Sequence, residues 1–217
     1  MKQFKDNCHV QRVACHSLSN FAMQMIAANA IIQKVICLSF FCFDKGGFQL
    51  LKQAITKFHD DHKLCWLASS AIWNLARPPV NRAVIGTDGV HLMLQVISKH
   101  SNEEQVINTA VGALSNLSLL SDLKDVIARP ENLDLILNVL SYFTMKKCAS
   151  VMTSGASLIA NIAVSGLLRR KYIFFCTYKK FLKNCTKFFL CYRRARNKFD
   201  QKGRAKNFNH APYMAKK

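Results

Sequence analysis

Apolar side chains recur at helical spacing in the sequence LCWLASSAIWNLAR, residues Leu64–Arg77. At about 100° per residue, one face of this helix carries only aliphatic residues. They are Leu64, Leu67, Ala68, Ala71, Ile72 and Leu75. The opposite face carries Trp66, Ser70, Trp73, Asn74 and Arg77. Both tryptophans of the chain are therefore predicted to point away from the packing face of their own helix. Because uncovered aromatic surface is costly in water, we expect another element or a partner to cover them.

The same pattern recurs around four asparagines. The contexts LSNFA, IWNLA, LSNLS and IANIA are centred on Asn20, Asn74, Asn116 and Asn161, at intervals of 54, 42 and 45 residues. A small residue stands six positions before each asparagine, and a large apolar residue follows it directly. The small residues are Ala14, Ala68, Ala110 and Gly155, and the large ones are Phe21, Leu75, Leu117 and Ile162. A period near 42 with helical patterning is typical of stacked helical repeats.

A second amphipathic helix is predicted before each of the later copies. Gly47 opens FQLLKQAITKF, Gly89 opens VHLMLQVIS, and Glu131 stands before LDLILNVLSYF. The pair Pro78-Pro79 ends the preceding helix and leaves room for a short helix over Val80–Ile85. Each unit is therefore predicted to hold a short, a medium and a long helix.

The segment GVHLMLQVIS…VINTAVGALSNLSL resembles an armadillo repeat, and the resemblance covers roughly Val10–Val164. It implies an all-α fold, a right-handed α-solenoid of about four three-helix units whose third helices line a concave groove. In that family the groove asparagines hold the backbone of an extended partner, which places Asn20, Asn74, Asn116 and Asn161 in that role. The importin-alpha type has a tryptophan four residues before the asparagine. Here that position holds His16, Ser70, Gly112 and Ser157, so a receptor for nuclear-localisation signals is disfavoured.

The sequence thus predicts a protein-binding groove. Beyond the four asparagines, its residues are expected to be Arg12, His16, Trp66, Ser70, Trp73, Arg77 and Asn108. Tryptophans would anchor a partner, and Arg77 would pair with an acidic group. Two alternatives stay open. The tryptophans would instead pack onto the adjacent third helix, or the small polar positions would simply be solvated helix surface.

The copies are not uniform. The first interval is about a dozen residues too long, which predicts an insertion near residues 35–45. The first unit begins inside a third helix, so its apolar face has no layer before it. We expect either a longer array or a homo-oligomer. The array is predicted to span residues 1–166, followed by a poorly ordered basic tail over 167–217.

The net charge of +19 lies mostly in that tail, since residues 167–217 contribute +15 of it. The clusters RRK at Arg169–Lys171 and RRARNK at Arg193–Lys198 are interleaved with Phe and Tyr. Such a segment would bind nucleic acid phosphates or anionic lipid, or would have no function of its own. Binding of nucleic acid or an anionic membrane through the tail is the alternative function.

No motif indicates an enzyme or a cofactor. The chain has no phosphate-binding glycine loop, and no nucleophile, base and acid stand at a recognisable spacing. His59, Asp60, Asp61 and His62, with Cys65 beyond, form a weak metal-site candidate, better explained as a solvated loop. Nine cysteines without a secretory signal or a CxxC pair indicate reduced thiols, and a cytoplasmic or nuclear protein. No small-molecule substrate is expected.

Overall fold

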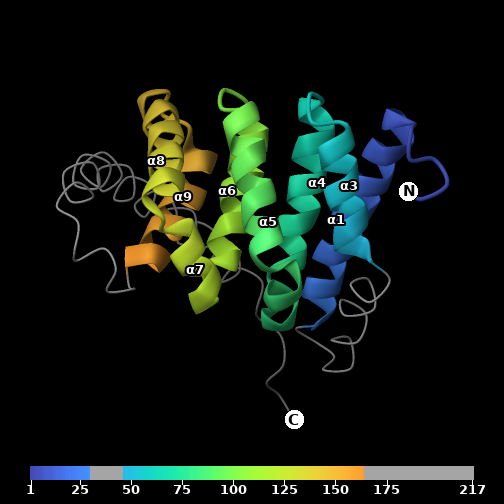
Figure 1. Ribbon diagram of the computed structural model, residues 1–217, viewed down its shortest axis with the longest axis horizontal. Coiled ribbons are helices and arrows are strands. Elements are labelled where there is room, and N and C mark those ends of the chain that lie inside the picture. Colours follow the sequence, from blue (N-terminus) through green and yellow to red (C-terminus); the bar gives the residue numbers. More distant parts are fainter. Residues whose placement is uncertain (30–45, 164–217) are drawn as a thin grey trace, which may run out of the picture. The chain divides into compact units, whose positions relative to one another are not determined.

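The computed structural model describes residues 1–29 and 46–163, and these residues form eight helices and no strand (Figure 1). The predicted all-α class is therefore confirmed for this part of the chain. The predicted insertion near 35–45 and the basic tail at 167–217 lie outside the described residues. The helices are α1 (Cys8–Asn29), α3 (Gly47–Lys57), α4 (His62–Leu75), α5 (Pro79–Lys99), α6 (Glu104–Leu117), α7 (Ser121–Ile127), α8 (Pro130–Met145) and α9 (Ala149–Ala163).

Four helices pack side by side in a row. Helix α1 contacts α4, α4 contacts α6, and α6 contacts α9. These are the helices that carry Asn20, Asn74, Asn116 and Asn161. The helices before them, α3, α5 and α8, lie along the same row and pack on α4, α6 and α9 (Figure 1). Contacts between successive helices of one kind therefore connect parts of the sequence that lie 42 to 54 residues apart.

Helix α5 is two helices joined at a sharp break. Gly86 has φ 56° and ψ −158°, in the half of the backbone map that glycine enters without a steric penalty. The segment before the break is the short helix predicted over Val80–Ile85, and Pro79 begins it. Proline suits this position because the first turn of a helix has no partner for its N–H groups. The short α7 occupies the same place before α8.

Small residues let the layers approach closely. A Cβ atom added to Gly155 of α9 would lie 2.5 Å from a methyl carbon of Leu140 on α8. Ala68 and Ala110, at the equivalent positions of α4 and α6, are fully buried. Large residues fill the space between, and Leu75, Leu117 and Ile162 are all buried. In α4, α6 and α9 the columns of the sequence pattern are thus columns of one core, whereas in α1 the equivalent Ala14 is half-buried and Phe21 is exposed.

None of the described helices is long and apolar enough to span a membrane.

Candidate functional site: an amide surface on four helices

Helix α4 places the predicted site residues where the sequence pattern put them, on the side opposite its buried aliphatic face. Trp66, Ser70, Trp73 and Asn74 are half-buried, and Arg77 is exposed just after the helix ends. Asp61 begins the helix, because its carboxylate accepts hydrogen bonds from the backbone N–H groups of Lys63 and Leu64, both at 3.1 Å. We call the region formed by Trp66, Trp73, Asn74, Asn116 and Asn161 the amide surface.

Three of the asparagines tie each helix of the row to the one before it. Asn74 Nδ2 donates to the carbonyl of Ser19 at 3.2 Å, and Asn116 Nδ2 to that of Trp73 at 2.9 Å. Asn161 Nδ2 donates to the carbonyl of Ser115 at 2.9 Å. In every case the acceptor is the residue directly before the asparagine of the preceding helix. Their amide nitrogens are therefore engaged within the protein.

Two of these carbonyls belong to helix ends. At the end of α4, the N–H of Arg77 donates to Asn74 and leaves the carbonyl of Trp73 to Asn116. Near the end of α6, the N–H of Leu119 donates to the carbonyl of Asn116, one residue past that of Ser115. The last carbonyls of a helix have no partner inside it. Asn116 supplies a donor to the carbonyl of Trp73. Asn161 supplies a second donor to the carbonyl of Ser115, which also accepts from the hydroxyl of Ser118 at 2.7 Å.

Asn20 differs from the other three. It is exposed, and its side-chain amide meets Nε2 of His16 on its own helix at 3.2 Å. Both residues were predicted to belong to the groove. Within the described residues, no helix lies before α1 in the row, so the bond that the other asparagines make has no acceptor here.

The indole of Trp73 lies against α6. A Cβ atom added to Gly112 would fall 2.5 Å from Cε2 of Trp73 and 2.7 Å from Cδ2. The indole therefore occupies the space that a side chain at position 112 would take. One of the two alternatives open from the sequence, packing of a tryptophan on the adjacent third helix, thus holds for Trp73, although its indole is only half-buried.

Further polar contacts join neighbouring helices beside the asparagines. Ser19 and Ser70 share a hydrogen bond of 2.9 Å between α1 and α4. The hydroxyl of Ser154 donates to Oδ1 of Asn108 at 2.7 Å between α6 and α9. Asn108 and Ser70 were predicted as groove residues, and both are engaged within the protein.

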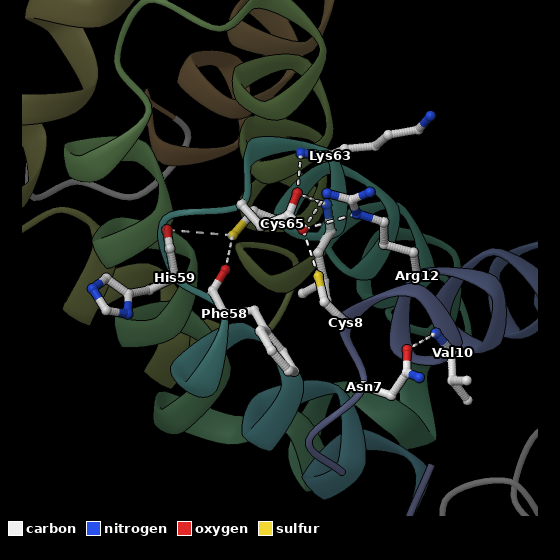
Figure 2. A network of polar contacts seen from close by, with 10 residues as sticks. Asn7, Cys8, Val10, Arg12, Phe58, His59, Lys63 and Cys65 are labelled. Carbon is white, nitrogen blue, oxygen red and sulfur yellow. Dashed lines mark hydrogen bonds and ion pairs between the residues drawn. The ribbon is translucent and has the colours of Figure 1, made fainter. Parts of the chain in front are cut away.

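Asp61 is the centre of a second network, shown in Figure 2 around Cys8 and Arg12. Arg12 Nη2 lies 2.6 Å from its carboxylate, and the thiol of Cys8 donates to it at 2.7 Å. Partial burial opposes ionisation of Asp61, but the bonds from Cys8, Leu64 and Arg12 outweigh it and lower its pKa to about 2. Arg12, predicted to face a partner, instead joins α1 to the start of α4. The role of Asp61 as the N-cap of α4 could be predicted from the local sequence. Its ion pair with Arg12, on another helix, could not.

The weak metal candidate does not form a cluster. Within residues 1–29 and 46–163, no three His, Cys, Asp or Glu side chains are placed to share a metal ion. Asp61 is engaged by Arg12, Asp60 pairs with Lys99 at 2.6 Å, and Cys65 is buried with its pKa raised to about 12 mainly by desolvation.

A pocket of about 540 Å³ lies away from the predicted site residues, between α3 and α5. Buried Ile55, Cys65, Leu92 and Val96 line it, with exposed polar residues such as Lys99 around them. None of the residues predicted for the groove is among its lining.

Comparison of the chain with family models, with curated proteins and with solved structures gave no match. The class supported by the structure is that of an all-helical protein over its described residues.

Proposed function

We propose that this protein is an armadillo-type interaction scaffold that holds an extended or helical protein partner on the amide surface. The proposal rests on one observation. The amide nitrogen of each of three asparagines, Asn74, Asn116 and Asn161, donates a hydrogen bond to the preceding helix. None of the hydrogen bonds among the described residues involves their Oδ1 atoms. All three side chains are half-buried. The surface therefore offers one acceptor from each of three successive helices of the row.

A polypeptide backbone is a suitable partner for such a row. Its N–H groups are donors, and an extended segment presents them at regular intervals. The asparagine carbonyl oxygens would accept these bonds, and the half-buried indoles of Trp66 and Trp73 would pack against side chains. Each Nδ2 carries two N–H groups, and Asn116 uses one of them on the carbonyl of Trp73, so the feature that all three asparagines share is an Oδ1 acceptor for the N–H groups of a partner.

Trp66 is the better residue with which to test binding. Replacing Trp73 also removes its packing on Gly112, so a loss of binding would be mixed with a loss of stability. Partners isolated on the immobilised chain are mapped by cross-linking and then titrated against Trp66→Ala. We expect a loss of affinity of at least about tenfold, which is typical of an aromatic anchor, with an unchanged unfolding transition.

The matched control is Val84→Ala, because Val84 on α5 is 55% exposed and lies outside the amide surface. This variant should bind as the wild type does. The proposal is wrong if the mapped contacts avoid α4 and α6, or if the two variants bind equally well. Binding that is lost only when residues 167–217 are removed would favour the tail as the interaction site.

A further inference from the structure

Helix α1 exposes positions that are buried in the other helices of the row. Val13 stands seven residues before Asn20 and is 54% exposed. The residues at the same position before Asn74, Asn116 and Asn161 are at most 9% exposed, namely Leu67, Thr109 and Ser154. Ser154 is covered by the preceding helix, since its hydroxyl bonds to Asn108 of α6. Val13 is therefore open because no described helix occupies that place before α1.

Helix α9 exposes the complementary positions. Ala160 stands directly before Asn161 and is exposed, whereas Ser19 and Ser115, at the same position in α1 and α6, are buried. The carbonyls of those two serines accept the bonds from Asn74 and Asn161. Thr153 occupies the position of Asn108 and is exposed as well. In α9 this face thus has no described successor.

We propose that the exposed face of α1 docks on the exposed face of α9 of a second copy of this chain, head to tail. The partner helix then takes the place that each preceding helix takes inside the protein. Asn20 turns from His16 and donates to the carbonyl of Ala160 of the partner subunit. This bond repeats the one made by Asn74, Asn116 and Asn161 at the three internal junctions.

The sizes of the side chains agree with this register. At the junction of α4 and α6, the large Trp73 is accommodated by Gly112. At the proposed junction, the equivalent positions hold Ala160 and His16, again a small residue opposite a large one. Asn108 and Ser154 set a second pairing, and its equivalent places Thr153 beside Val13. The apolar Val13 would thereby gain cover, and no two bulky side chains would meet at either pairing.

A head-to-tail contact is heterologous, because two different faces meet, and each copy keeps one open face. The assembly therefore grows with protein concentration, and it can be blocked from either end. Val13→Arg spoils the α1 face and Ala160→Arg spoils the α9 face. Both positions are exposed, so neither substitution should disturb the fold. Val84→Arg on α5, at 55% exposure, is the control.

The masses of the full-length chains are measured by sedimentation velocity over a wide range of concentration. We expect the wild type and Val84→Arg to form dimers and longer species, and each of the other variants alone to stay monomeric. An equimolar mixture of Val13→Arg and Ala160→Arg should form dimers and nothing larger, because one intact face of each kind remains. Unchanged circular dichroism spectra exclude unfolding as the cause.

Three results would overturn the proposal. The first is a wild type that stays monomeric at the highest concentration. The second is an Ala160→Arg variant that dimerises while Val13→Arg does not, which would indicate a symmetric contact between two α1 faces. The third is a mixture of the two variants that gives no dimer.

Discussion

At the residue scale, an asparagine here has two ends with different uses. Its Nδ2 binds the carbonyl of the preceding helix, as Asn116 does with Trp73, and its Oδ1 is left for another donor. A single side chain thereby helps to hold the row together and also forms the proposed binding surface. Replacing such an asparagine changes both properties, so binding losses at these positions must be compared with stability.

The contact between Trp73 and Gly112 gives a prediction whose sign depends on the tryptophan. In a helix, alanine is favoured over glycine by about 1 kcal/mol, but here the new methyl group would meet the indole. Gly112→Ala should therefore lower the free energy of unfolding in the wild type, by about 1–3 kcal/mol as overpacking does. In a Trp73→Ala background the same change should raise it. Urea unfolding of the wild type, Gly112→Ala, Trp73→Ala and the double variant measures the four free energies of this double-mutant cycle. A loss of similar size in both backgrounds would contradict the contact.

At the scale of helices, neighbouring members of the row are joined by a bond at one fixed register and by contacts that vary. Between α1 and α4 the additional contacts include Ser19 with Ser70 and Arg12 with Asp61. Between α4 and α6 the indole of Trp73 packs on Gly112 instead. The fixed bond sets the axial register of one helix relative to the next, because the side-chain amide reaches only one backbone carbonyl of the preceding helix.

Asn116 and Asn20 occupy equivalent positions of the repeat, but only Asn116 bonds to the preceding helix. Comparing their substitutions therefore measures the contribution of that bond to stability. Asn116→Ala removes the bond to Trp73, whereas Asn20→Ala removes only the contact with His16 on the same helix. Both substitutions replace an asparagine by alanine, although Asn20 lies inside α1 and Asn116 lies in the last turn of α6. We expect Asn116→Ala to lower the free energy of unfolding by about 1 kcal/mol more than Asn20→Ala, the usual worth of one hydrogen bond. Thermal and urea unfolding measure it. Equal losses would mean that the bond between α4 and α6 contributes nothing.

At the scale of the described molecule, each helix of the row depends on its neighbours. Helices α4 and α6 have a row member on either side, while α1 and α9 have one each among the described residues. Stability in such an arrangement is close to a sum over nearest neighbours. The middle of the row should therefore be the last part to open.

Native-state hydrogen exchange read by mass spectrometry tests this expectation. Amides of α4 and α6 should exchange most slowly, and those of α1 and α9 sooner, because fewer contacts must break to release them. The Val13→Arg variant is the suitable protein, since association would protect the end helices. Uniform exchange from all four helices would show instead that they open as one unit.

The sequence allowed the helices and their order to be predicted, because each element carries its own periodicity and its own stop signals. The short helix before Gly86, the start of α3 at Gly47 and the buried columns at Ala68 and Leu75 all follow from local pattern. The partners of the polar site residues could not be predicted in this way. Arg12 and Asp61 lie 49 residues apart, and the sequence around either residue does not indicate that the two form a pair.

What the sequence determined by itself is therefore the set of helices, the buried faces of α4, α6 and α9 and the matching sequence positions of the four asparagines, since these depend on spacing along the chain. What only the tertiary structure decided is which atom each polar side chain uses. The distance between neighbouring helices brings Asn116 to the carbonyl of Trp73 and sets the indole on Gly112. That distance results from packing of the whole core, and no single stretch of sequence encodes it.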